Sequence, residues 1–170
     1  MIVTLILSII MMAALFLMLF AGVAFIQDKK YFTSAPKDIQ EAIQPKEERF
    51  RGAHPLGGCL FTISILTFPV VLVYAGWDGV RHGFHFEMLF VRYLMMLLLL
   101  KAFDILVFDL FLLSNSHFYQ HYYPETEGCA GFHQFGFNWK SHLAMILAAF
   151  PVSLILAWIC TLFKKVGGVI

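Results

Sequence analysis

The segment from residue 2 to residue 26 reads IVTLILSIIMMAALFLMLFAGVAFI, and Thr4 and Ser8 are its only polar side chains. A helix needs about 20 consecutive apolar residues to cross a bilayer, and this run exceeds that length. It has no basic segment in front, and its apolar core is longer than the roughly 7–15 residues of a secretory signal sequence. The segment is therefore predicted to be a membrane-spanning helix.

Three further apolar runs have a similar length: residues 56–76, 86–113 and 143–163. Of all residues, 60% are hydrophobic and 14% are charged, against roughly half and a quarter in soluble domains. A soluble domain of 170 residues has too small an interior to bury that much apolar surface. The sequence predicts an all-α integral membrane protein, a single domain over residues 1–170 in which four transmembrane helices form a bundle.

The first and third connections between these runs have distinct compositions. In the first connection, residues 27–52, Ile39, Ala42 and Ile43 would share one face of a short helix, which is typical of an amphipathic helix at a membrane interface. The third connection, after Leu113, is rich in aromatic residues and histidine. Aromatic rings are favoured at the boundary between membrane and water, so we expect this loop to lie compactly on the membrane.

Basic residues are concentrated on one side of the predicted topology. Seven lie in the first and third connections: Lys29, Lys30, Lys37, Lys46, Arg49, Arg51 and Lys140. Three lie on the opposite side: Arg81, Lys164 and Lys165. Because cytoplasmic loops carry an excess of Lys and Arg, we expect a multi-pass protein of the plasma membrane with both termini outside.

The third apolar run carries ionisable residues within its length. Lys101 and Asp104 are three residues apart, so they share a helix face and can form an ion pair. This pair could simply lock the helices together, or it could line a polar cavity that opens towards the cytoplasm through Asp109. Lys101, Asp104 and Asp109 are therefore candidate substrate-binding residues. Arg92 points the opposite way and is expected to extend to the outer headgroups.

Histidines in the third connection indicate a possible metal or catalytic site. His117 and His121 are four residues apart and would project from one face if the third helix continued to Tyr123. The candidate ligands for a divalent transition metal, zinc or iron, are His117, His121, His133 and Glu127. The candidate catalytic residues are His117, His121, His54 and Glu125. In the alternative interpretation, these histidines bond lipid headgroups and loop carbonyls independently.

The His117–His121 spacing beside a membrane helix is similar to a histidine box of the integral-membrane fatty-acid hydroxylases and desaturases. Those enzymes hold two irons with several such boxes. This chain has one box, and five histidines on its predicted cytoplasmic side. The chain also has no HExxH, no GxxxxGK[ST] and no GxSxG motif, so the sequence assigns no family.

Three functions are compatible with these features. The first is an enzyme that acts on a lipid or another amphiphile, with Arg49, Arg51 and Lys140 contacting an anionic headgroup. The second is a transporter or channel component that uses the charged third helix. The third is a non-catalytic accessory protein. The expected partners are membrane lipids and either a second copy or another membrane protein, whereas a net charge of +1 gives no attraction to nucleic acid.

Overall fold

The computed structural model describes residues 2–29, 35–44, 46–134 and 136–166. Residues 164–166 are described by their backbone alone. Within these ranges the regular structure is helical and contains no strand. The long helices are α1 (Ile2–Phe20), α3 (Ala53–Arg81), α4 (Phe86–Phe103) and α6 (Trp139–Val166). Two of them continue as π-helices, α1 into η1 (Ala21–Ile26) and α4 into η3 (Asp104–Ser114). The short helices are α2 (Lys37–Ala42), α5 (Phe118–Tyr122), η4 (Pro124–Thr126) and η5 (Ala130–His133).

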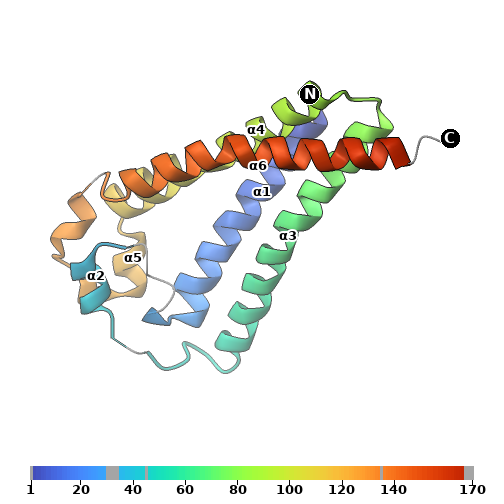
Figure 1. Cartoon of the computed structure of the whole chain (residues 1–170). Helices are drawn as coiled ribbons and strands as arrows, with labels where there is room; N and C mark the ends of the chain where they lie inside the picture. The colour runs from blue at the N-terminus through green and yellow to red at the C-terminus, as the bar shows by residue number, and fades with distance from the viewer. Residues whose placement is uncertain (1, 30–34, 45, 135, 167–170) are drawn as a thin grey trace.

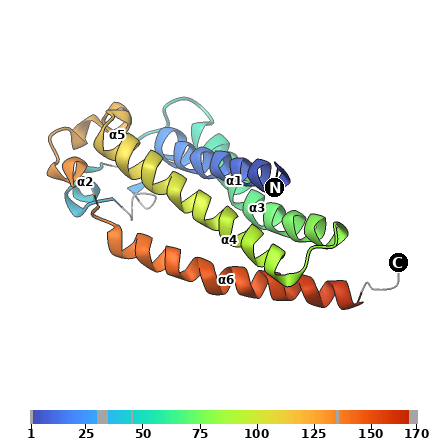
Figure 2. The ribbon, with the colours of Figure 1, turned by 90° about the horizontal axis from the view of Figure 1, so that it is seen from above.

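The long helices form two antiparallel pairs, α1 with α3 and α4 with α6 (Figure 1). Viewed from above, α4 lies between α1 and α6 (Figure 2). One apolar core joins α1, α3 and α4, and it consists of Leu7, Met11, Val71, Ala75, Tyr93 and Met96. The two pairs meet at this core and diverge towards the end of the molecule that carries α2 and α5 (Figure 1).

Three helical segments are long and apolar enough to span a membrane: Ile2–Ile26, Ala53–Arg81 and Trp139–Phe163. They confirm the first, second and fourth predicted runs as helices of spanning length, and the second and fourth begin earlier than predicted. Most of their large apolar side chains face away from the protein; Val73 is 72% exposed and Trp158 57% exposed. These outward faces suit a membrane-embedded protein.

The third predicted run, residues 86–113, forms α4 and η3, but its charges distinguish it from the other three segments. It carries Glu87, Arg92, Lys101, Asp104 and Asp109, and it is not among the segments that are apolar enough to span on composition alone. The fourth span therefore stays a prediction, as does the four-helix bundle.

The first and third connections pack on each other through a second apolar core. Ile39 and Ile43 are 1% and 3% exposed, and they pack with Tyr119, Tyr123 and Phe132 of the third connection. The predicted amphipathic helix is therefore present as α2, but its apolar face covers the rest of the chain rather than lying in the membrane interface. We call this folded end, residues 35–44 and 115–134, the cap.

Polar contacts also join the first connection to the third. Lys46 Nζ lies 3.1 Å from a carboxylate oxygen of Glu125, and the Gly131 N–H donates to Asp38 Oδ2 at 2.7 Å. Partial burial opposes ionisation of Glu125, but hydrogen bonds from its own backbone N–H, from Lys46 and from the Gln44 N–H outweigh this burial and lower its pKa. Glu125 is thus held as a carboxylate that ties the third connection to the first.

Candidate functional site

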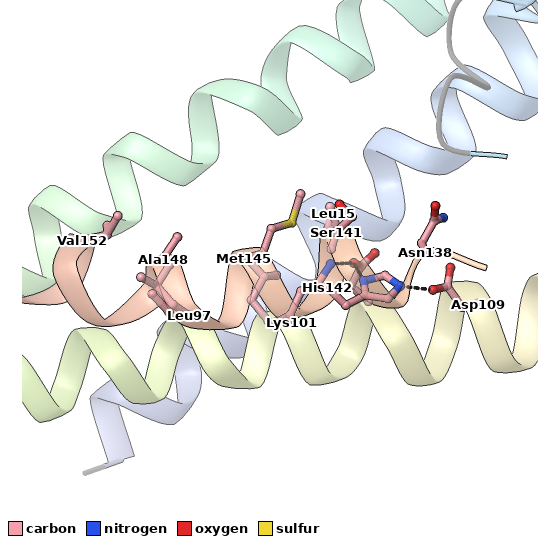
Figure 3. Close-up of a pocket in the computed structure, with 13 residues that line it drawn as sticks. Leu15, Leu97, Lys101, Asp109, Asn138, Ser141, His142, Met145, Ala148 and Val152 are labelled. Atoms are coloured by element: carbon pink, nitrogen blue, oxygen red, sulfur yellow. Dashed lines mark hydrogen bonds and ion pairs between the residues drawn. The ribbon is translucent and has the colours of Figure 1, made fainter. Parts of the chain in front are cut away.

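A pocket of about 510 Å³ lies between the α4–η3 helix and α6, with α1 at its edge. Its apolar lining consists of Leu15, Leu97, Leu100, Met145, Ala148, Ala149 and Val152. Its polar lining consists of Lys101, Asp104, Asp109, Asn138, Ser141 and His142. Figure 3 shows Asp109, Asn138 and His142 towards one end of the pocket and Leu97, Ala148 and Val152 towards the other. The pocket is therefore amphipathic along its length.

The antiparallel packing of η3 and α6 brings Asp109 and His142 together at the polar end. Asp109 lies in the middle of η3 and His142 lies in the first turn of α6, and the antiparallel packing places them at the same level. His142 Nε2 lies 2.5 Å from Asp109 Oδ2, and both side chains are mostly buried, at 13% and 20% exposed. A carboxylate in this position orients the imidazole and favours a proton on Nε2.

The predicted pair of Lys101 and Asp104 is confirmed, because Lys101 Nζ donates to Asp104 Oδ2 at 2.5 Å. The same Asp104 oxygen lies 4.0 Å from His142 Nδ1. Two carboxylates of η3 thus flank one imidazole of α6. We call Lys101, Asp104, Asp109 and His142 the charged cluster.

The π-helical backbone of η3 explains how both carboxylates reach the same imidazole. In an α-helix, residues five positions apart point about 140° away from each other. A π-helix closes its hydrogen bonds between residues five apart, which brings such residues close to one face. Asp104 and Asp109 are the two residues concerned, and they lie at the start and in the middle of η3. π-Helical segments are frequent at functional sites.

His142 Nδ1 has an unusual environment. It is buried and forms no hydrogen bond with any part of the chain that the structure describes. Since the other ring nitrogen is held by Asp109, Nδ1 can accept a proton or a hydrogen bond from a bound molecule.

The histidines of the third connection do not converge. Residues 115–117 interrupt the helix, and α5 starts afresh at Phe118, so the continuous helix to Tyr123 that a shared face for His117 and His121 requires is not formed. His117, His121, His133 and Glu127 are all exposed, and the ring of His121 packs edge-on against its neighbour Tyr122. Among the described residues, no group of three or more His, Cys, Asp or Glu is placed to hold a metal ion. The geometry gives the predicted metal site no support.

The other predicted site residues have separate local partners. His54 Nδ1 lies 3.6 Å from a carboxylate oxygen of Glu48, and Glu125 pairs with Lys46 as described above. Arg49 lies over the ring of Tyr122 and Lys140 over that of Trp139, at 5.4 and 5.8 Å from the ring centroids, while Arg51 is exposed. None of these residues is among the described residues that line the pocket.

Arg92 does not extend to the outer headgroups, which corrects the prediction for it. Its side chain is 3% exposed, and Nη1 donates to Asp78 Oδ2 at 2.7 Å and to the Ala75 carbonyl at 2.8 Å. Its guanidinium also covers the ring of Phe84 at 4.5 Å. The short turn between α3 and α4 brings Asp78 to the level of Arg92, so an internal carboxylate replaces the lipid headgroup as its partner.

His142 is one of the five histidines on the predicted cytoplasmic side, but it was not among the candidate site residues. The signal that could have selected it is its position in the first turn of the helix that follows the third connection, opposite the charged helix. The chain matches no protein-family model, no curated protein and no solved structure. Its function is therefore inferred from the geometry of the pocket.

Proposed function

We propose that this protein is a polytopic membrane protein that binds a single amphiphilic molecule between the α4–η3 helix and α6. The observation that carries the proposal is the separation of the pocket lining into a charged end and an apolar end. A polar head group would lie at the charged cluster, and an apolar chain would lie along Leu97, Met145 and Val152. The volume of about 510 Å³ falls within the range of ligand-binding pockets, about 300–1,000 Å³.

Binding of an amphiphile is the step that the enzyme hypothesis and the carrier hypothesis have in common. The predicted substrate-binding role of Lys101, Asp104 and Asp109 is retained, because all three line the pocket. We assign to His142 the acid–base role that the sequence predicted for His117, His121, His54 and Glu125. This histidine lines the pocket, its Nε2 is held by Asp109, and its Nδ1 lies 4.0 Å from Asp104 Oδ2.

We also propose that the α4–η3 helix is the fourth membrane span. An ionised side chain in a bilayer is tolerated when it has an internal partner. Lys101 is paired with Asp104, Asp109 with His142, and Arg92 with Asp78. These pairs reduce the cost of placing the helix in the bilayer. We place the protein in the plasma membrane, and with four spans the distribution of basic residues supports an orientation with both termini outside.

Cysteine labelling tests this topology at two exposed positions. Glu127→Cys and His85→Cys lie on either side of the α4–η3 helix, and each is made in a chain whose native cysteines, Cys59, Cys129 and Cys160, are replaced by serine. In intact cells, a membrane-impermeant maleimide should label residue 85 and should label residue 127 only after permeabilisation. Labelling of residue 127 alone in intact cells would contradict the proposed orientation, and labelling of both positions from the same side would contradict the fourth span.

A pocket-filling substitution tests the binding function. Ala148 is exposed on α6 and lines the pocket, so Ala148→Trp should fill the apolar end without disturbing the core. Ala144 is also exposed on α6 but does not line the pocket, which makes Ala144→Trp the matched control. Binding of dodecylamine, dodecanol and dodecanoate would be measured by calorimetry on the full chain in phosphatidylcholine nanodiscs, after subtraction of protein-free nanodiscs.

We expect at least one of these amphiphiles to bind saturably with one molecule per chain. The affinity should fall roughly tenfold or more in Ala148→Trp and should be unchanged in Ala144→Trp. Equal affinity in the wild type and Ala148→Trp, or no saturable binding of any of the three, would overturn the proposed function.

A further inference from the structure

We infer that the preferred head group is a protonated primary amine, and that its binding displaces a proton from His142. This inference rests on the proposed function, because it concerns the ligand of the same pocket. It follows from the charge balance of the charged cluster and from the position of His142 Nδ1.

The charge balance favours a cation. The described residues that line the pocket include two carboxylates, Asp104 and Asp109, and one ammonium group, Lys101. Lys101 compensates Asp104, to which it is bonded. With a neutral His142, the carboxylate of Asp109 leaves one negative charge uncompensated in a mostly buried site. An uncompensated buried charge is costly, so an imidazolium at residue 142 or a bound cation would stabilise the carboxylate of Asp109. An anionic head group would add to the imbalance.

The hydrogen-bond geometry favours a donor with more than one N–H. When Nε2 of His142 donates to Asp109, a neutral imidazole presents Nδ1 as an acceptor. Nδ1 then faces another acceptor, Asp104 Oδ2, at 4.0 Å. Two acceptors at this separation need a donor between them. A primary ammonium group has three N–H bonds and can donate to both atoms, whereas a trimethylammonium group can donate to neither.

The other titratable groups around His142 do not change this balance. Lys140, the neighbour of the lining residue Ser141 on α6, does not itself line the pocket; it is exposed and lies over Trp139. Tyr119 of α5 has a pKa raised by burial and by the carboxylates of Asp109 and Asp104, so it remains neutral. From α1, the lining residue is Leu15. The charge state of the site is therefore decided by the charged cluster itself.

The exchange is balanced in charge and in protons. In the free protein, an imidazolium at His142 donates through Nε2 to Asp109 and through Nδ1 towards Asp104. When the protonated amine binds, the proton on Nδ1 leaves to water, and the ammonium group donates one N–H to Nδ1 and another to Asp104 Oδ2. The net charge of the site is the same before and after, and one proton is released for each amine bound.

Calorimetry of the wild-type chain in phosphatidylcholine nanodiscs tests the exchange directly. Dodecylamine would be titrated in buffers of different ionisation enthalpy, which measures the number of protons released on binding. Histidine side chains change charge between roughly pH 5 and 8. We expect about one proton to be released per amine bound in the acid part of that range. By linkage, each unit of pH decrease there should weaken amine binding roughly tenfold. In His142→Gln, proton release and this pH dependence should be lost, whereas His85→Gln, at an exposed site outside the pocket, should behave as the wild type.

Head-group selectivity in the wild type provides a second measurement that does not depend on any variant. Dodecylamine should bind roughly tenfold or more tightly than dodecyltrimethylammonium and dodecanoate at neutral pH. Equal affinity for the amine and its trimethyl analogue, a preference for dodecanoate, or amine binding without proton release would overturn the inference. If those results were accompanied by saturable binding that Ala148→Trp weakens, the proposed function would stand and this inference alone would fail.

Discussion

Replacing Arg92 by methionine is expected to lower the free energy of unfolding by about 3–5 kcal/mol, the usual cost of breaking a buried ion pair. The physical reason is the carboxylate left behind. Asp78 is 8% exposed and loses the guanidinium at 2.7 Å. His82 also approaches this carboxylate, with Nδ1 3.2 Å from Oδ1, but its side chain is 63% exposed and replaces little of the lost interaction. Equilibrium unfolding in mixed detergent–SDS micelles measures the loss.

Two further variants distinguish the effect of breaking the ion pair from the effect of removing any arginine. Arg81 is exposed and lies over the ring of Trp77 at 5.3 Å, so Arg81→Met should cost less than about 0.5 kcal/mol. Asp78→Leu combined with Arg92→Met removes both charges and should be more stable than Arg92→Met alone. A double variant that is no more stable than Arg92→Met alone would mean that the two side chains do not interact.

Replacing Gly76 by alanine is expected to lower the free energy of unfolding by about 1–3 kcal/mol, as overpacking of a dense core does. A Cβ at this position would lie 2.5 Å from Tyr93 Oη and 2.6 Å from Cys160 Sγ. Tyr93 is 2% exposed, and its hydroxyl donates to the Leu72 carbonyl at 3.0 Å, so it has little freedom to move. The substitution should therefore push α4 and α6 away from α3.

Gly58 provides the matched control in the same helix. A Cβ at Gly58 would meet nothing within 4 Å, and alanine restricts the unfolded chain more than glycine does. Gly58→Ala should therefore raise the free energy of unfolding by up to about 1 kcal/mol. The two glycine substitutions should thus have opposite signs in the same unfolding measurement. A loss of similar size at both positions would mean that the effect comes from the helix backbone and not from the contact with Tyr93.

Features that depend on residues close together in the chain could be predicted from the sequence. The three apolar segments became helices of spanning length because length and apolarity are properties of a single segment. The ion pair of Lys101 and Asp104 could be predicted because three residues span less than one helical turn. The amphipathic pattern of residues 38–43 likewise predicted α2, although not the surface that α2 covers.

Features that depend on how helices meet were decided by the tertiary structure. The partner of Arg92 is Asp78 of α3, and the partner of Asp109 is His142 of α6. Both pairs depend on the rotation of each helix about its axis and on the register of two hairpins, and neither quantity can be read from composition or spacing. The apolar face of α2 likewise packs against the third connection instead of the membrane, because the third connection folds beside it.

The sequence by itself determined the all-α architecture, the positions of the apolar helices and the presence of charges in the third run. The tertiary structure alone determined that these charges meet His142 around an amphipathic pocket. The reason lies in the backbone of η3 (Asp104–Ser114): in an ordinary α-helix, Asp104 and Asp109 would point about 140° apart. Its π-helical hydrogen bonds bring both carboxylates to one imidazole, and a residue pattern counted at 3.6 residues per turn cannot reveal that change of period.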